Sequence, residues 1–225
     1  MHPSGFHFLP SAPAYFLALA LVFAIAIALV EFLSHAYEKM GVNRRYVYLL
    51  LFFSLLGGLI NIPIARLKAK PVVSEEDVTF RWMEYRAPVV DELRGTVLAI
   101  NVGGAIIPTI LSIYLIVKNS LYTRAVAGVA VVTVLVYLLA TPVLGKGIAV
   151  PTFVPPIVAA AVAMLLSREK AAPLAYISGT LGTLIGADIL NLGILSNLGA
   201  SVASIGGAGT FDGVFLTGII AVLLA

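Results

Sequence analysis

Long apolar runs alternate with short polar connections along most of this 225-residue chain. A helix needs about 20 mostly apolar residues to cross a hydrocarbon core about 30 Å thick, and seven runs come near that length. The pattern therefore predicts an all-α fold, a polytopic bundle of about seven transmembrane helices. The predicted spans are approximately Ala14–Leu33, Tyr46–Ala65, Val97–Val117, Ala125–Leu144, Ile148–Leu166, Pro173–Leu195 and Gly206–Leu224.

One long polar segment, residues 66–95, separates the second predicted span from the third. It carries six basic and six acidic residues. Ser74 is followed by three acidic residues, and acids after a capping residue are typical of a helix N-terminus. We therefore predict an interfacial helical segment with a solvated charged face. The alternative for this segment is a docking surface for a substrate or a partner.

The composition places the whole chain, residues 1–225, in a single membrane domain. Hydrophobic residues make up 60% of the chain and charged residues 11%, and the mean hydropathy is +1.05. A soluble domain of this size needs far more polar surface, so we expect a multi-pass protein of the cell membrane in contact with the lipid bilayer. The 14 Lys and Arg residues divide equally between the two sets of alternate connections, so the positive-inside rule predicts no orientation.

Residue counts exclude several kinds of chemistry. The chain has no cysteine, which excludes disulfides, thiolate nucleophiles and cysteine-ligated metals. Its three histidines, His2, His7 and His35, all precede the second predicted span, so no His-rich metal site and no cofactor are expected. The net charge of +3 is not concentrated in a basic stripe, which argues against nucleic-acid binding.

Two aspartates stand in apolar, glycine-rich sequence, Asp188 in GTLIGADILNLG and Asp212 in GGAGTFDGVFLTG. An ionisable residue in the hydrocarbon region is costly and marks a functional site by default. Both lie twelve residues from Ala200, so a helical hairpin turning there places the two carboxyls at about the same depth. The connection between them is rich in glycine, and irregular backbone is tolerated at this depth where it lines a wet cavity. We therefore predict two carboxyls that face a water-accessible crevice.

Two facing carboxyls share one proton, so one can activate water while the other donates to a scissile carbonyl. This is the chemistry of an aspartyl protease, here with a transmembrane peptide as the substrate. On this hypothesis Asp188 and Asp212 are the catalytic residues. The supporting residues are Gly186, Asn191, Gly209, Thr210, Gly213, Asn61, Asn101 and Pro151.

Two further hypotheses use the same residues differently. Broken helices with nearby polar residues are typical of transporters, so the aspartates could bind a proton or a cation with help from Asn61, Asn101 and Asn191. Alternatively, the protein is a non-catalytic scaffold. Its intramembrane Asn residues then join helices by hydrogen bonds, and Asp212 caps the helix that follows it.

Four stretches of the chain together resemble an uncharacterised family of prokaryotic membrane proteins, over about Thr96 to Ala225: NVGGAIIPTILSIYL, GIAVPTFVPPIVAA, YISGTLGTLIGADILNLG and ASIGGAGTFDGVFLTGIIAVLLA. That likeness implies a polytopic membrane protein and no particular activity. Residues 207–225 are also similar to the GxGD helix of presenilin and signal-peptide-peptidase type intramembrane aspartyl proteases, with Phe211 in the place of the second glycine. The second resemblance implies that Asp188 and Asp212 correspond to the two catalytic aspartates.

Overall fold

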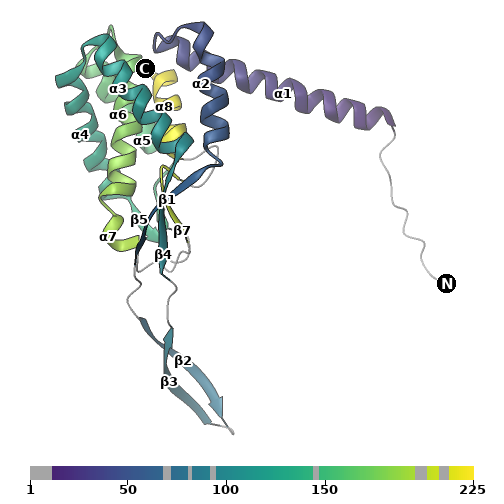
Figure 1. Ribbon diagram of the computed structural model, residues 1–225, viewed down its shortest axis with the longest axis vertical. Coiled ribbons are helices and arrows are strands. Elements are labelled where there is room, and N and C mark those ends of the chain that lie inside the picture. The colour runs from purple at the N-terminus through teal and green to yellow at the C-terminus, as the bar shows by residue number, and fades with distance from the viewer. Residues whose placement is uncertain are drawn as a thin grey trace.

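Helices make up most of the structure, and short strands lie at one end of the helical bundle (Figure 1). The computed structural model describes residues 12–67, 72–80, 83–91, 95–143, 147–195, 202–207 and 213–225. The helices are α1 (Ala12–Lys39), α2 (Arg44–Gly57), α3 (Ile107–Asn119), α4 (Tyr122–Leu139), α5 (Val154–Leu166), α6 (Ala171–Thr183), α7 (Leu192–Leu195) and α8 (Gly213–Leu224). Two π-helical turns are η1 (Val102–Ile106) and η2 (Leu184–Ile189). The strands are β1 (Asn61–Leu67), β2 (Val72–Phe80), β3 (Met83–Asp91), β4 (Thr96–Asn101), β5 (Thr141–Val143), β6 (Gly147–Ala149) and β7 (Val202–Ile205).

Within the residues that the structure describes, four helical stretches are long and apolar enough to cross a membrane. They are Tyr15–Lys39, Val102–Asn119, Tyr122–Leu139 and Ala171–Ile194. Helices α5 and α8 are apolar but shorter. The chain is therefore a mostly helical, multi-pass membrane protein, but the prediction of seven spans is wrong.

The second and third predicted spans were misread because each combines a helix with a strand. Helix α2 ends at Gly57, where the N–H of Gly58 bonds to the carbonyl of Ser54 at 3.0 Å, and the chain then becomes extended. Pro63 lies at an irregularity of β1, an edge strand, where a missing N–H is tolerated. Hydropathy depends only on the side chains, whereas a helix and a strand differ in where their backbone groups find hydrogen-bond partners. It therefore cannot distinguish an apolar strand from an apolar helix.

The fourth and fifth predicted spans also contain strand. Helix α4 ends at Leu139, and β5 pairs with β6 as an antiparallel hairpin in which Thr141 faces Ala149. Helix α5 begins only at Val154, with prolines in its first turn, where no intrahelical N–H is needed. The helical part of the fifth span is thereby reduced to 13 residues.

The central sheet has the strand order β1-β4-β7. Strand β4 is antiparallel to β1, with Asn61 facing Asn101, and parallel to β7, with Val97 facing Val202. Strand β7 lies in the segment expected to be the turn of a helical hairpin, so that expectation is wrong. Within the described residues β7 is an edge strand of this sheet.

The polar segment 66–95 contains strands in place of the predicted helix. Strands β2 and β3 pair antiparallel from Val72 opposite Asp91 to Phe80 opposite Met83. β-branched and aromatic residues are frequent in both strands, and Pro88 would break a helix. The acidic residues after Ser74 thus lie in a strand, in a hairpin that extends away from the helices (Figure 1).

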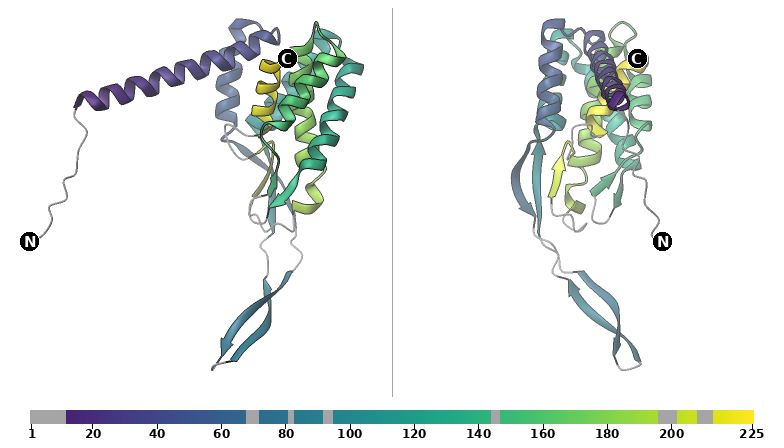
Figure 2. Two further views of the ribbon diagram at one scale, coloured as in Figure 1. Left: turned by 180° about the vertical axis from the view of Figure 1, so that it is seen from behind. Right: turned by 90° about the vertical axis from the view of Figure 1, so that its right-hand side faces the viewer.

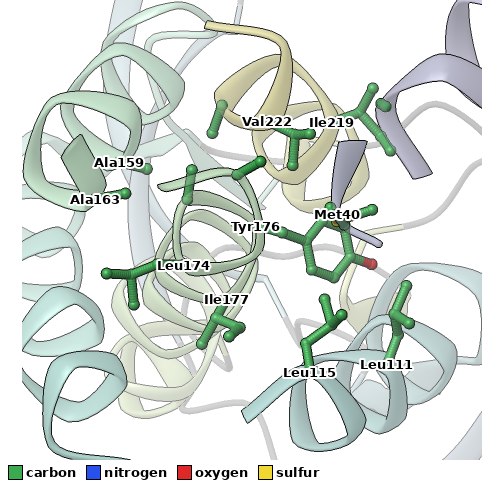
Figure 3. Close-up of a cluster of buried hydrophobic side chains, with 14 of the residues drawn as sticks. Met40, Leu111, Leu115, Ala159, Ala163, Leu174, Tyr176, Ile177, Ile219 and Val222 are labelled. Carbon is green, nitrogen blue, oxygen red and sulfur yellow. The ribbon is translucent and has the colours of Figure 1, made fainter. Parts of the chain in front are cut away.

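Helix α6 is the centre of the bundle. Twelve of its 13 residues are buried, and it packs against α3, α4, α5 and α8. Figure 3 shows its residues Leu174, Tyr176 and Ile177 among side chains of α3, α5 and α8. Glycine permits the closest of these contacts, because a Cβ at Gly182 would lie 2.6 Å from the Cβ of Val132. This tightly held helix carries η2, and with it Asp188, at its C-terminal end.

Helix α1 projects away from the bundle (Figure 2). Residues 15–32 are exposed, and the contact with α2 and α8 is made by the last turns, where Leu33, Ala36 and Tyr37 are buried. In its most apolar window only 6% of the residues are buried. This surface is suited to contact with the lipid bilayer.

Candidate functional site

A cavity of about 430 Å³ lies where the strands meet the helical bundle. Its wall is formed by β6, the end of α6, η2, β7 and the start of α8. Most lining residues are small or apolar, and the polar side chains are those of Thr152, Thr183, Asp188 and Ser204. A mostly apolar hollow with a few convergent polar groups is typical of a binding site.

The π-helical turn η2 determines how Asp188 meets this cavity. The N–H of Leu190 bonds to the carbonyl of Ile185 at 3.0 Å, across five residues. In an α-helix, five residues correspond to about 500° of rotation, which would turn Asp188 well away from the side of Thr183. A π-turn closes over five residues, and Thr183 and Asp188 both line the cavity. Single π-turns within α-helices are frequent at functional sites.

A glycine turn after β7 holds the Asp188 carboxylate. The N–H of Gly206 donates to Asp188 Oδ2 at 2.7 Å. Gly206 has φ +82°, and a Cβ there would lie 2.6 Å from the backbone of Gly104 and Ala105. A Cβ at Gly104 would in turn lie 1.8 Å from the carbonyl oxygen of Gly206. Glycine is therefore required on both sides of this contact, which fixes the donor beside Asp188.

Asn61 and Asn101 lie together in a network beside the sheet. Asn101 Nδ2 donates to the Asn61 side-chain oxygen at 3.0 Å and to the Gly58 carbonyl at 2.8 Å. The Gly104 N–H donates to Asn101 Oδ1 at 2.7 Å, and Ser204 Oγ donates to Asn61 Oδ1 at 2.6 Å. Both asparagine oxygens thus accept protein hydrogen bonds. The network joins the end of α2 to β1, β4, η1 and β7, which makes it a frame for the site.

The other described supporting residues have separate roles. Asn191 Nδ2 donates to the carbonyls of Gly186 and Ala187 at 2.9 and 3.0 Å, and so caps backbone groups of η2. Gly186 allows α4 to approach, because a Cβ there would lie 2.6 Å from the Thr133 carbonyl oxygen. Pro151 is exposed in the connection between β6 and α5, whereas Gly213 lines the cavity.

Gly209, Thr210 and Asp212 lie outside the described residues. The pairing of Asp188 with Asp212 therefore stays a prediction. In the sequence Asp212 immediately precedes Gly213. The part of the chain that the structure describes contains no group of three or more His, Cys, Asp or Glu residues able to hold a metal ion.

Thr183 is a candidate that sequence reasoning missed. Its side chain is only 4% exposed, it lines the cavity, and its hydroxyl has no hydrogen-bond partner among the described residues. A buried hydroxyl without a partner is costly, so water or a bound ligand in the cavity is a natural partner. The only signal in the sequence that could have identified Thr183 is its spacing of five residues from Asp188. This spacing places two side chains on the same side only in a π-turn, so it is informative only once η2 is known.

Comparison with protein families identifies the chain. Residues 55–224 match the family model described as "Protein of unknown function (DUF1614)". The chain belongs to the DUF1614 family. This confirms the resemblance to an uncharacterised family of membrane proteins and carries no activity with it. No curated protein and no solved structure matches the chain, and nothing in the comparisons supports the likeness to presenilin-type proteases.

Proposed function

We propose that this DUF1614 protein is an intramembrane aspartyl protease in which Asp188 and Asp212 share the catalysis. The observation that carries the proposal is the position of Asp188, which lines a partly polar cavity bordered by an edge strand. Gly213, which follows Asp212 in the sequence, lines the same cavity. An acidic residue at such a site in a membrane protein is costly and is retained for function.

The two carboxyls take different roles in this proposal. The Gly206 N–H donates to Asp188 Oδ2 at 2.7 Å and so holds this carboxyl in position. In the proposed reaction Asp188 is the base that takes a proton from water, while the water oxygen bonds to the scissile carbonyl carbon. Protonated Asp212 donates to the carbonyl oxygen. Collapse of this intermediate breaks the C–N bond. The amine leaves with the proton from Asp188, and the diol returns a proton to Asp212 as the carboxylic acid forms.

Thr183 supports the attacking water in this scheme. Thr183 and Asp188 both line the cavity, and the buried Thr183 hydroxyl has no hydrogen-bond partner among the described residues. A hydroxyl can donate one hydrogen bond and accept others, so it can orient a water molecule. Positioning the nucleophile is a separate contribution from taking its proton.

The substrate in this proposal is a transmembrane peptide bound in extended form. A helical segment hides its carbonyls in backbone hydrogen bonds, so the scissile bond must first be unwound. All four residues of β7 line the cavity, and β7 is an edge strand within the described residues. An edge strand offers backbone groups to an added strand. The hydrogen bonds lost on unwinding can thus be replaced within the site.

Cleavage of single-span peptides by purified protein tests the proposal. Wild type, Asp188→Asn and Asp212→Asn are compared in detergent, with products identified by mass spectrometry. We expect cleavage by wild type and a loss of at least about 1,000-fold in each variant, as for a residue essential to general acid–base catalysis. The matched control is Glu169→Gln, since Glu169 is an exposed acid in the connection between α5 and α6.

Thermal unfolding of the same preparations separates catalysis from folding. Wild-type stability together with lost cleavage supports the catalytic assignment. Cleavage that survives in both Asp variants refutes it. A large loss of stability in both variants, with no peptide cleaved by wild type, supports a non-catalytic scaffold.

Proton- or cation-coupled transport is the second candidate function. The observation that favours it is that the π-turn η2 interrupts the candidate span Ala171–Ile194 beside β7. Interrupted helices are typical of transporter binding sites. This candidate predicts pH- or sodium-dependent flux in proteoliposomes that Asp188→Asn abolishes. Equal flux through wild type and variant excludes it.

A further inference from the structure

A groove separate from the Asp188 cavity runs between α2 and α3. Its volume is about 660 Å³, and its lining is almost entirely apolar. Leu49 and Phe53 of α2 and Ile110 of α3 line it, and each of these side chains is more than half exposed. These exposed apolar side chains are suited to contact with acyl chains.

One end of the groove is polar and basic. Tyr46 and Tyr114 line it there, and Lys118 Nζ lies 5.5 Å from the centre of the Tyr114 ring. Lys118 also donates to the Gly41 carbonyl, which places the end of α3 against the start of α2. Arg45 is exposed in the first turn of α2. Tyrosines and long cationic side chains are typical of the level of the lipid headgroups.

The charges at this end are not balanced by nearby acids. Arg44 pairs with Glu38 at 3.2 Å, but within the described residues neither Arg45 nor Lys118 has an ion-pair partner. Two exposed cations that do not themselves line the groove are therefore found next to its tyrosines, Arg45 before Tyr46 in the chain and Lys118 over the ring of Tyr114. An anionic headgroup above an acyl chain complements this arrangement.

The length of the groove fits the same ligand. Phe53 lies eight residues after Arg45, or about 12 Å along α2. Half of a hydrocarbon core is about 15 Å thick, so an acyl chain whose headgroup lies beside Arg45 reaches Phe53. We propose that the α2–α3 groove binds an anionic phospholipid, with its phosphate between Arg45 and Lys118 and one acyl chain along Leu49, Phe53 and Ile110.

Tryptophan quenching by brominated lipids tests this site. The chain has one tryptophan, Trp82, so the Trp82→Phe background leaves an introduced tryptophan as the only reporter. Phe53→Trp places the reporter in the groove, and Ile110→Trp is a second reporter on the opposite wall. Val131→Trp is the matched control, because Val131 is exposed, lies nine residues after the start of α4, and does not line the groove.

The proteins are placed in phosphatidylcholine nanodiscs that contain a small fraction of chain-brominated phosphatidylglycerol or chain-brominated phosphatidylcholine. Each cation near an anionic surface favours binding by about five-fold, so we expect the groove reporters to prefer phosphatidylglycerol by at least about that factor. The Val131→Trp reporter should respond equally to both lipids. Arg45→Gln with Lys118→Gln should remove the preference, and Arg45→Gln alone should reduce it.

The matched charge control is Arg168→Gln, which removes an exposed cation from the connection between α5 and α6 and should leave the preference intact. Equal quenching by the two lipids at Phe53→Trp and Ile110→Trp would overturn the proposal. So would the absence of quenching by either lipid at both positions, since a second copy of the chain or another protein then fills the groove. The result is independent of peptide cleavage, because no residue of the Asp188 cavity is changed.

Discussion

Replacement of Gly206 by alanine tests whether the glycine turn after β7 positions Asp188. Gly206 has φ +82°, which costs a non-glycine residue about 1–3 kcal/mol. The new Cβ would also lie 2.6 Å from backbone atoms of Gly104 and Ala105, and overpacking of this kind typically costs about 1–3 kcal/mol. We therefore expect Gly206→Ala to lower the free energy of unfolding by about 2–6 kcal/mol.

Two control glycines separate these costs. Gly147 has φ +115° with open space around its Cβ position, so Gly147→Ala should show the conformational cost alone. Gly193 also has open space and has no strained φ, so Gly193→Ala should be neutral or slightly stabilising. Reversible unfolding in mixed detergent measures all three variants. The difference between Gly206→Ala and Gly147→Ala then estimates the steric contribution.

The same series has a functional consequence. Relief of the contact with Gly104 and Ala105 requires the Gly206 N–H to move from Asp188 Oδ2, to which it donates at 2.7 Å. Cleavage of the peptide substrate should therefore fall in Gly206→Ala, measured at a temperature where the variant is folded, by more than in Gly193→Ala, because Gly147 itself lines the cavity whereas Gly193 does not. Gly206→Ala with wild-type stability and wild-type cleavage would refute this account of the turn.

Three further substitutions test other parts of the structure. Thr183→Val should change the free energy of unfolding by less than about 1 kcal/mol, because its hydroxyl has no partner to lose among the described residues, yet it should lower peptide cleavage. Unchanged cleavage would contradict the role of Thr183. Asn101→Leu should lower the free energy of unfolding by about 2–5 kcal/mol in a chemical unfolding assay, because it leaves the Gly104 N–H and the Gly58 carbonyl without their side-chain partner. A loss below about 1 kcal/mol would count against the network. Gly182→Ala should lower the free energy of unfolding by about 1–3 kcal/mol. Val132→Ala should partly restore it in the double variant, because it removes the side chain that the new Cβ meets, and full additivity of the two changes would argue against that contact.

The sequence identified the central helical spans with small errors at their ends. The predicted spans Ala125–Leu144 and Pro173–Leu195 contain most of α4 and nearly all of α6, η2 and α7. These stretches are apolar over a length that only a membrane or a protein core can accept, so hydropathy is sufficient to find them. The same reasoning counted seven spans, because a short apolar strand after Gly57 or before Val102 has the same hydropathy as a helix.

The strands required information that lies far away in the chain. β4 is a strand because β1 supplies partners from up to 40 residues earlier and β7 from 105 residues later, as the pairs Asn61 with Asn101 and Val97 with Val202 show. A strand satisfies its backbone groups only through another strand, whereas a helix satisfies them locally. Local sequence therefore predicts helices better than strands in this protein.

For the candidate site, the sequence by itself determined that Asp188 and the asparagines are polar residues within apolar stretches, because this can be read directly from the order of the residues. Only the tertiary structure decided their roles. It showed that Asn61 and Asn101 hold neighbouring elements together, because their side-chain oxygens accept hydrogen bonds from the protein. It also showed that the π-turn η2 lets Thr183 and Asp188 line the same cavity. The physical reason is that a hydrogen bond depends on the position and direction of its partner, and these are fixed only when β7 and the Gly206 turn meet the helices.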